Sequence, residues 1–286
     1  MWLWYILASA VLLGLYDVAK KHSLKKNDSL VILLISTGLT VLFLTPWATM
    51  GTVQGHLCLL FKAVLVSASW ITGMLALEKL PITLVSTFKA CRPVLVLIFS
   101  IAIYGEMLNL WQWGGSILAL VAIWMLSLTG KKEGIDWRHS RGVLYMMIAV
   151  LTGVASALWD KYLLGSQFLA LDSQFVQFWA NVYVTLLLAV IILVRRFVRP
   201  GSCKPFRWDW TIPLIAILIT AADFLYFYAV HSEGALLSVI SMIRRGSVVV
   251  TFAVGAILFK EKNIKGKALA LATMLVAMLL IVIGSS

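Results

Sequence analysis

The sequence contains few charged residues for its length. Asp, Glu, Lys and Arg together make up 13% of its 286 residues, whereas soluble domains contain about 25%. Hydrophobic residues make up 62% of the chain, and its mean hydropathy is +0.97. This composition excludes a soluble globular protein and predicts a polytopic membrane protein surrounded by the lipid bilayer.

Several classes of functional site are excluded by what is missing. Three cysteines and four dispersed histidines are too few and too scattered for a disulfide framework or a zinc site. The chain has no nucleophile elbow, no zinc-protease histidine pair and no phosphate-binding loop. We therefore expect no enzyme activity, no metal and no cofactor.

Apolar segments account for most of the chain. We find ten, at about 3–20, 29–47, 60–77, 82–104, 109–129, 142–163, 174–194, 211–231, 235–259 and 264–284. A bilayer core is crossed by about 20 apolar residues, and backbone polar groups in lipid need internal partners. The predicted fold class is an all-α membrane protein with ten transmembrane helices.

Positive charge is unevenly distributed among the predicted loops. Of the 24 Lys and Arg residues, eighteen lie in the odd-numbered loops, two in the even-numbered loops and four inside predicted spans. By the positive-inside rule, the odd-numbered loops are cytoplasmic and both termini face outside. We attribute the net charge of +12 to this orientation signal and expect no nucleic-acid partner.

The sequence also contains an internal repeat. Residues 86–106 (STFKACRPVLVLIFSIAIYGE) align with residues 241–261 (SMIRRGSVVVTFAVGAILFKE) at an offset of 155. The alignment matches Lys89 with Arg244 and Glu106 with Glu261. One basic position therefore recurs at the same place in each half of the chain.

Each half of the chain contains five predicted spans, so the second half must enter the bilayer in the opposite direction. Matching loops accordingly have opposite charge bias, as an inverted repeat requires. We expect two inverted five-helix repeats, residues 1–130 and 142–286, joined by a polar linker at 131–141.

Four basic residues lie inside predicted spans, namely Lys89, Arg92, Arg244 and Arg245. A charge at the centre of a membrane helix costs about 2.5–3.5 kcal/mol on insertion scales, and Arg donors suit carboxylate or phosphate. Pro93 removes a helical bond to the carbonyl of Lys89, and interrupted helices are typical of transporter sites. The predicted substrate-binding set is Lys89, Arg92, Arg244, Arg245, Ser86, Ser241 and Tyr226. Alternatively, the basic side chains extend to the membrane edge or pair with acids.

Three acidic residues lie in the spans, namely Asp17, Asp160 and Asp223. Asp17 and Asp160 occupy matching positions at an offset of 143. Each acid is a candidate proton carrier or counter-ion. Asp223 is the candidate partner of Arg244 or Arg245. Helical spacing offers the alternatives of Asp17 paired with Lys20 or Lys21, and Asp160 paired with Lys161.

Each half resembles the EamA unit of the drug/metabolite transporter superfamily. The resemblance rests on Leu75-Ala76 through Tyr104-Gly105-Glu106 with Gly114-Gly115, and on Phe227-Tyr228 through Lys260-Glu261 with Gly266. It implies ten helices in two inverted repeats around a central substrate cavity, in a plasma membrane such as the bacterial inner membrane. The stretch 243–250 also resembles the basic pair and valines of the sugar-phosphate and nucleotide-sugar branches, where the pair contacts an anionic substrate.

These observations predict a secondary transporter that moves a small organic anion or zwitterionic metabolite by alternating access. An alternative within the superfamily is a proton-driven exporter of amino acids or toxic cations. A non-transporting membrane scaffold or an intramembrane enzyme is the alternative of another class. The sequence leaves open the substrate, the direction of transport, the coupling ion or exchange partner and the oligomeric state.

Overall fold

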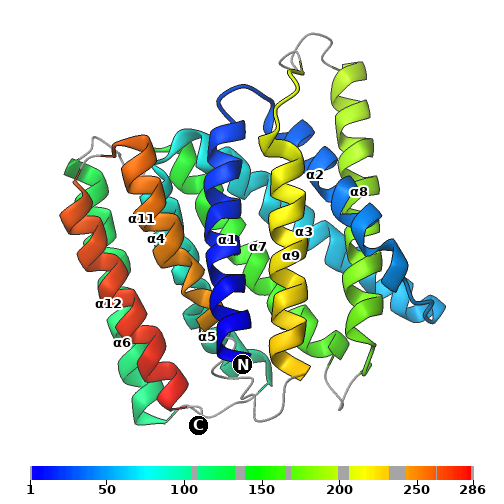
Figure 1. Ribbon diagram of the computed structural model, residues 1–286. Coiled ribbons are helices and arrows are strands. Elements are labelled where there is room, and N and C mark those ends of the chain that lie inside the picture. The colour runs from blue at the N-terminus through cyan, green and yellow to red at the C-terminus, as the bar shows by residue number, and fades with distance from the viewer. Residues whose placement is uncertain are drawn as a thin grey trace.

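The computed structural model describes residues 2–104, 109–132, 139–164, 169–198, 206–231, 243–261 and 263–284. All regular structure in these ranges is helical (Figure 1). The helices are α1 Trp2–Ser23, α2 Ser29–Leu44, α3 Val53–Lys79, α4 Ile82–Ala90, α5 Arg92–Tyr104, α6 Leu110–Lys132, α7 Arg141–Leu164, α8 Ser173–Val198, α9 Thr211–His231, α11 Ser247–Phe259 and α12 Ile264–Ile283, and a 3-10 turn, η1, covers Thr45–Trp47.

Seven of the described helices are long and apolar enough to cross a membrane. They are α1, α2 with η1, α3, α6, α7, α8 and α12, while α9 contributes a shorter apolar stretch. These findings confirm the prediction of an all-α membrane protein.

The start of α3 shows the largest departure from the predicted apolar segments. The segment 82–104 is divided into α4 and α5, and residues 235–242 of the ninth segment lie outside the described residues. α3 begins at Val53 instead of at about residue 60, because Thr52 caps the helix and accepts a hydrogen bond from the backbone of Gly55 at 3.2 Å. The correction moves Lys62 from a predicted loop into the body of α3. α6 likewise continues to Lys132, two residues into the predicted linker.

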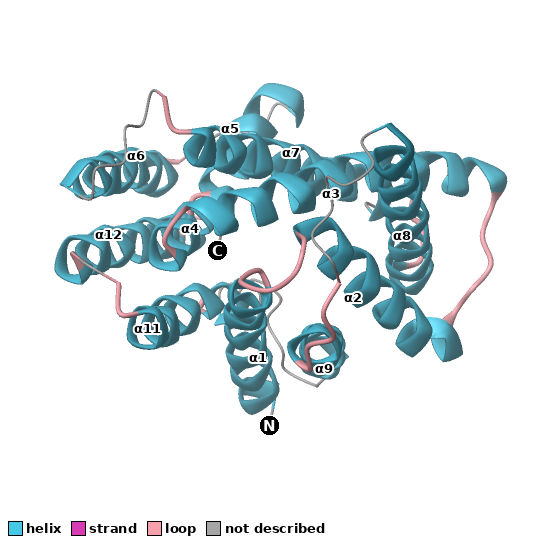
Figure 2. Ribbon diagram, turned by 90° about the horizontal axis from the view of Figure 1, so that it is seen from above, coloured by secondary structure: helices cyan, strands magenta, loops and turns pink. Residues whose placement is uncertain are grey.

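The helices interlock across the predicted boundary between the halves. α1 packs against α9 and α11, α3 against α7 and α8, and α6 against α12. Seen from above, α6 and α12 lie side by side at one edge, while α2 and α8 lie at the other (Figure 2). α6 and α12 approach closely at Gly115, where an added Cβ would lie 2.7 Å from the carbonyl oxygen of Ala277.

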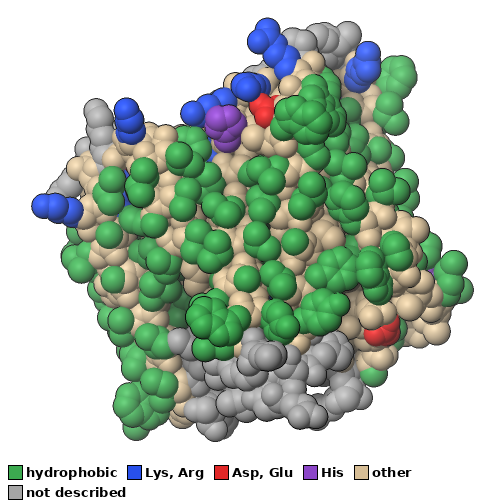
Figure 3. All heavy atoms as spheres, viewed as in Figure 1, with side chains coloured by type: hydrophobic (Ala, Val, Ile, Leu, Met, Phe, Trp, Pro, Cys, Tyr) green, Lys and Arg blue, Asp and Glu red, His purple; other side chains and the backbone are tan. Residues whose placement is uncertain are grey.

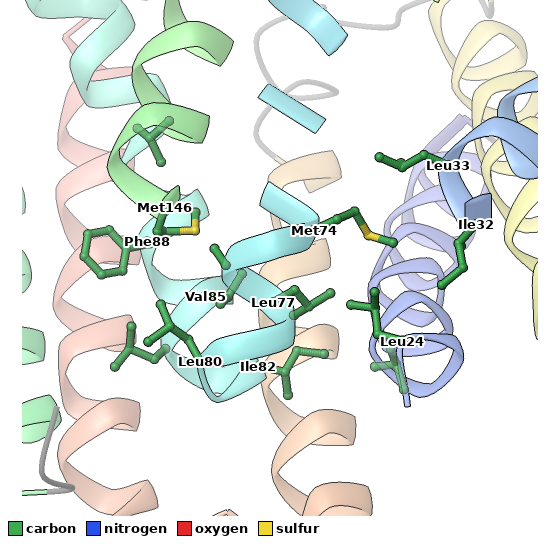
Figure 4. Packing of buried hydrophobic residues seen from close by; sticks show 14 of the residues in the cluster. Leu24, Ile32, Leu33, Met74, Leu77, Leu80, Ile82, Val85, Phe88 and Met146 are labelled. Atoms are coloured by element: carbon green, nitrogen blue, oxygen red, sulfur yellow. The ribbon is translucent and has the colours of Figure 1, made fainter. Parts of the chain in front are cut away.

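The main hydrophobic core lies where α3 turns into α4. Leu77, Leu80, Ile82 and Val85 are each no more than 3% exposed, and they pack with Met146 of α7 (Figure 4). In a bundle surrounded by lipid, such packing stabilises the fold through close van der Waals contacts between helices. This core holds the beginning of α4 in place, and α4 carries the first candidate site residues.

The two ends of the bundle differ in charge. α1 begins and α12 ends at the same end (Figure 1). On the face shown in Figure 3, Lys and Arg side chains gather at the opposite end, and hydrophobic side chains cover the surface between the ends. This distribution is the one that the loop charges predict.

Candidate functional site

The helix that carries Lys89 is interrupted two residues later. α4 ends at Ala90, Cys91 forms a turn and α5 begins at Arg92. The backbone N–H of Cys91 bonds to the carbonyl of Phe88 at 3.0 Å instead of continuing the α-helical pattern. Pro93 has no N–H with which to bond the carbonyl of Lys89, so the local sequence accounts for the interruption.

A second interruption follows Arg244. Residues 243–245 are helical, Gly246 forms a turn, and α11 begins at Ser247. The N–H of Gly246 bonds to the carbonyl of Ile243 at 2.9 Å. At the offset of 155, Gly246 corresponds to Cys91, so the two interruptions occupy matching positions in the sequence.

Each interruption lies beside an ion pair. Lys89 Nζ is 2.6 Å from Asp17 Oδ1, which joins α4 to α1. Arg244 pairs with Asp223, which joins the segment before α11 to α9. The partners are between 17% and 33% exposed, so they are only partly removed from solvent.

The two ion pairs belong to one cluster. Tyr16, next to Asp17 on α1, lies within electrostatic range of Lys89 and Asp223. The ring of Tyr226 lies beneath the guanidinium of Arg244, with its centroid 4.2 Å from Cζ. This distance is that of a cation–π contact.

Arg92 belongs to the cluster but is held by uncharged groups. Its Nη2 donates to Ser69 Oγ at 3.1 Å and to the carbonyl of Ala149 at 3.3 Å. A Cβ added at Gly153 would lie 2.1 Å from Nη2, so only glycine leaves room for the guanidinium. Asp17 lies within its electrostatic range.

Arg245 is exposed, unlike the other three basic residues. No carboxylate among the described residues lies within ion-pair distance of it. Arg92, Arg244 and Tyr226 lie within its electrostatic range. Arg245 therefore brings a positive charge to the cluster without a neutralising partner among these residues.

The remaining predicted site residues lie apart from this cluster or outside the described ranges. Ser86 is 1% exposed, and its hydroxyl donates to the carbonyl of Thr83 in its own helix. Asp160 Oδ1 lies 2.5 Å from Lys62 Nζ, between α7 and α3. Ser241 lies outside the described residues.

The helical neighbours of Asp17 have other contacts in the structure. Lys20 lies over the ring of Tyr16, 3.9 Å from its centroid, although Asp17 remains within its electrostatic range. Lys21 donates to the carbonyls of Leu77 and Leu80. Asp17 is thereby left to pair with Lys89.

Glu261 fixes the beginning of α4 from the other half of the chain. Its carboxylate accepts hydrogen bonds from the backbone N–H groups of Ile82 and Thr83 at 2.6 and 3.2 Å, and from the Thr83 hydroxyl. Lys267 Nζ lies 3.5 Å from the same carboxylate and is fully buried. A carboxylate at a helix N-terminus is favourable because the N–H groups there lack helical partners.

Three residues that shape the cluster are not indicated by the sequence. Ser69 and Gly153 position Arg92, and Gln177 donates from Nε2 to Asp223 Oδ2 at 3.1 Å. Outside the cluster, Lys62 pairs with Asp160. These contacts join residues more than 20 positions apart, so spacing carries no signal for them.

The arrangement offers partly exposed charged groups to a ligand. No group of three or more potential metal ligands occurs among the described side chains. A partly exposed charged side chain at a helix interruption can release its internal partner and bind a ligand whose charge has the same sign as that of the partner. The cluster therefore has the chemistry of a binding site for a charged small molecule.

Comparison with known proteins bears on the family and the fold of the chain. A search of curated proteins gives no match. One solved structure, described only as "Crystal structure of protein", is 13% identical to this chain, with a TM-score of 0.62 over 98% of each chain, so the fold alone is shared. The model of the EamA-like transporter family matches residues 1–128, the part that contains α1 to α5 and the pair Lys89–Asp17. Residues 1–128 are therefore similar to the EamA-like transporter family, and the described apolar helices make the chain a multi-pass membrane protein.

Proposed function

We propose that the protein is a secondary transporter that moves a small organic anion or zwitterionic metabolite by alternating access. The observation that carries the proposal is the charged cluster at two helix interruptions in an otherwise apolar bundle. Among the described residues, the basic side chains that meet there (Lys89, Arg92, Arg244 and Arg245) outnumber the acidic ones (Asp17 and Asp223). An anion is the ligand that balances this excess of positive charge.

Substrate binding would exchange one carboxylate for another. An incoming anion competes with Asp223 for Arg244, while Arg245 supplies a further fork of donors. The displaced Asp223 is then able to take up a proton or to bind a positive group of a zwitterion. The Arg244 guanidinium has a counter-ion throughout this exchange, so no unpaired charge is left there. Uptake of a proton by the displaced Asp223 offers a route to proton coupling.

The repeat relation supports the transport mechanism. We propose two inverted five-helix repeats, residues 1–130 and 142–286, joined by the linker 131–141. In inverted-repeat transporters, one repeat rocks against the other around a site near the midplane. The matching interruptions after Lys89 and Arg244 support this assignment, and the basic end of the bundle supports a plasma-membrane orientation with both termini outside.

The test is counterflow in proteoliposomes with a panel of carboxylates, amino acids and phosphorylated metabolites. The variants Lys89→Gln, Arg244→Gln and Arg245→Gln are each expected to reduce transport of the best substrate at least tenfold. Lys62→Gln is the matched control, because Lys62 also pairs with an aspartate inside the bundle but lies outside the cluster. Unchanged transport in all three site variants would refute the anion site.

A second candidate function is favoured by the two carboxylates in the cluster. A proton-driven exporter of cations would depend on Asp17 and Asp223 more than on the arginines. In that case Asp17→Asn or Asp223→Asn abolishes transport driven by a pH gradient, whereas Arg245→Gln leaves it intact. The same proteoliposomes, with the gradient imposed and removed, distinguish the two functions.

A further inference from the structure

A cavity of about 350 Å³ lies beside the charged cluster, between α2, η1, α8 and α9. Its size falls within the range of about 300–1,000 Å³ that is typical of small-molecule sites. Four aromatic rings line it, those of Trp47, Phe178, Phe224 and Tyr228. The cavity lies towards the end of the bundle at which α1 begins, because α2 and α9 end there (Figure 1).

Gln177 connects this cavity to the ion pair of Asp223 and Arg244. Its side chain lines the cavity, and its Nε2 donates to Asp223 Oδ2 at 3.1 Å. The other oxygen of Asp223 accepts from Arg244. The side chains of Gln177 and Asp223 therefore form a hydrogen-bonded connection from the cavity wall to Arg244, the first guanidinium of the cluster.

The walls of the cavity suit a flat, uncharged group. The rings of Trp47 and Phe224 meet edge to face, with centroids 4.6 Å apart, and this arrangement leaves a ring face open to a third ring. Trp47 is 46% exposed and Tyr228 is 65% exposed, so both have surface that a ligand would cover.

No Lys or Arg is among the described residues that line the cavity. Among these lining residues the carboxylate is that of Asp172, which accepts a hydrogen bond from the N–H of Phe175 at 3.3 Å and thereby caps α8. An anionic group would find no counter-ion among the described lining residues. The anionic end of a ligand belongs instead at Arg244 and Arg245, on the other side of Gln177.

We infer that the substrate is an organic anion that carries an aromatic ring, and that the ring occupies this cavity while the anionic group binds at the arginines. Gln177 is the specificity-determining residue between the two parts. Its amide donates to Asp223 in the structure, and it becomes available to the substrate when Asp223 leaves Arg244. The inference rests on the proposed anion transport and adds the class of substrate.

The experiment compares carboxylates of equal charge with the purified full chain in detergent. Acetate, cyclohexylacetate, phenylacetate and indole-3-acetate are the probes, and their dissociation constants are taken from thermal stabilisation. We expect phenylacetate and indole-3-acetate to bind at least tenfold more tightly than acetate. The affinity for cyclohexylacetate should lie between the affinities for acetate and phenylacetate, because its ring is apolar but not flat.

Two variants locate the ring preference. Trp47→Leu is expected to reduce the preference for phenylacetate over acetate at least fivefold without weakening acetate itself. Gln177→Ala is expected to reduce the same preference at least fivefold and also to change the affinity for acetate, because Gln177 bonds to Asp223. Trp47→Phe should retain the preference because a ring remains. Trp111→Leu is the matched control, because Trp111 is an exposed tryptophan on the distant α6.

The outcomes separate this inference from the proposed function. If no carboxylate stabilises the protein, the proposed anion transport fails. If acetate and phenylacetate bind equally and Trp47→Leu changes neither, anion transport stands and the aromatic class is refuted. Tighter binding of phenethylamine than of phenylacetate would show that the cavity takes a cation, which also overturns the inference.

Discussion

The two helix interruptions, at Cys91 and at Gly246, hold their neighbouring positive charges in different ways. At both, the basic residue two positions earlier pairs with an aspartate on another helix. At the first interruption, the additional base Arg92 is bonded to Ser69 and to the Ala149 carbonyl. At the second, the additional base Arg245 is exposed and has no carboxylate partner among the described residues.

From this difference we interpret Arg92 as a structural cation, which stabilises the fold, and Arg245 as a binding cation, which is available to a ligand. The uncharged acceptors at Nη2 of Arg92 also fix its position, so it contributes charge to the cluster without being free to move. Arg245 keeps its donors for a ligand. The aspartates differ in the same way, because Asp223 is shared between Arg244 and Gln177, whereas Asp17 pairs with Lys89.

The largest effect is expected from releasing the beginning of α4. Glu261→Ala removes the acceptor of two backbone N–H groups and the partner of the buried Lys267. We expect a loss of at least about 3 kcal/mol in the free energy of unfolding, since the substitution breaks a buried ion pair and removes the acceptor of two backbone N–H groups. The loss is measured as a lower melting temperature in detergent. Glu261→Gln retains an acceptor oxygen and should lose less; equal losses would show that the charge is unimportant.

The next effect sharpens the comparison between the two additional bases. Arg245→Gln should lower kcat/KM for the anionic substrate about 10- to 100-fold, since a charge-assisted hydrogen bond contributes about 1.5–3 kcal/mol. Arg92→Gln should mainly lower the melting temperature. Parallel transport and melting measurements on both variants provide the check. A greater transport defect in Arg92→Gln would reverse the assignment of binding and structural cation.

Most of the fold could be predicted because lipid permits few alternatives. Backbone groups in a bilayer must form helices, so long apolar runs locate helices almost directly. The beginning of α3 was misplaced because its first turns contain Gln54 and His56, which interrupt the apolar run. His56 Nδ1 lies 2.8 Å from the hydroxyl of Tyr183, and its ring meets that of Trp179 edge to face. Such partners are distant in sequence and leave no local pattern.

The candidate site was predictable as a set of charges but not as a set of contacts. The free-energy cost of placing a charge inside the membrane marks Lys89, Arg244 and Asp223 as candidates without reference to their neighbours. Their pairing depends on helix packing. Helical spacing suggested Lys20 or Lys21 as the partner of Asp17, whereas its partner in the structure is Lys89. The cap that Glu261 supplies to α4 spans 179 positions to Ile82, so no local rule reaches it.

A smaller effect tests whether Arg92 is held as rigidly as its contacts indicate. Gly153→Ala places a methyl group where Nη2 of Arg92 now lies, so the guanidinium must move and lose its bonds to Ser69 and Ala149. We expect a loss of about 1 kcal/mol, at the low end for overpacking, because only a side-chain end has to shift. Arg92→Lys should restore the melting temperature of Gly153→Ala, since the ammonium is narrower. Additive losses in the double variant would contradict this steric coupling.

The smallest effect comes from an ion pair outside the membrane-spanning helices, which serves as a reference for the pairs within. Asp209 lies 2.9 Å from Lys26 and accepts bonds from the N–H and hydroxyl of Thr211, at the beginning of α9. The backbone hydrogen bond from Thr211 lowers the pKa of Asp209 from 3.8 to about 2, and Lys26 adds to the effect. Its stabilisation is therefore complete above about pH 4 and declines as the pH falls towards 2. Asp209→Asn should cost about 1 kcal/mol at pH 7, and the difference from wild type should narrow in melting curves below pH 4. A constant difference from pH 7 to pH 3 would mean that the carboxylate charge does not stabilise α9.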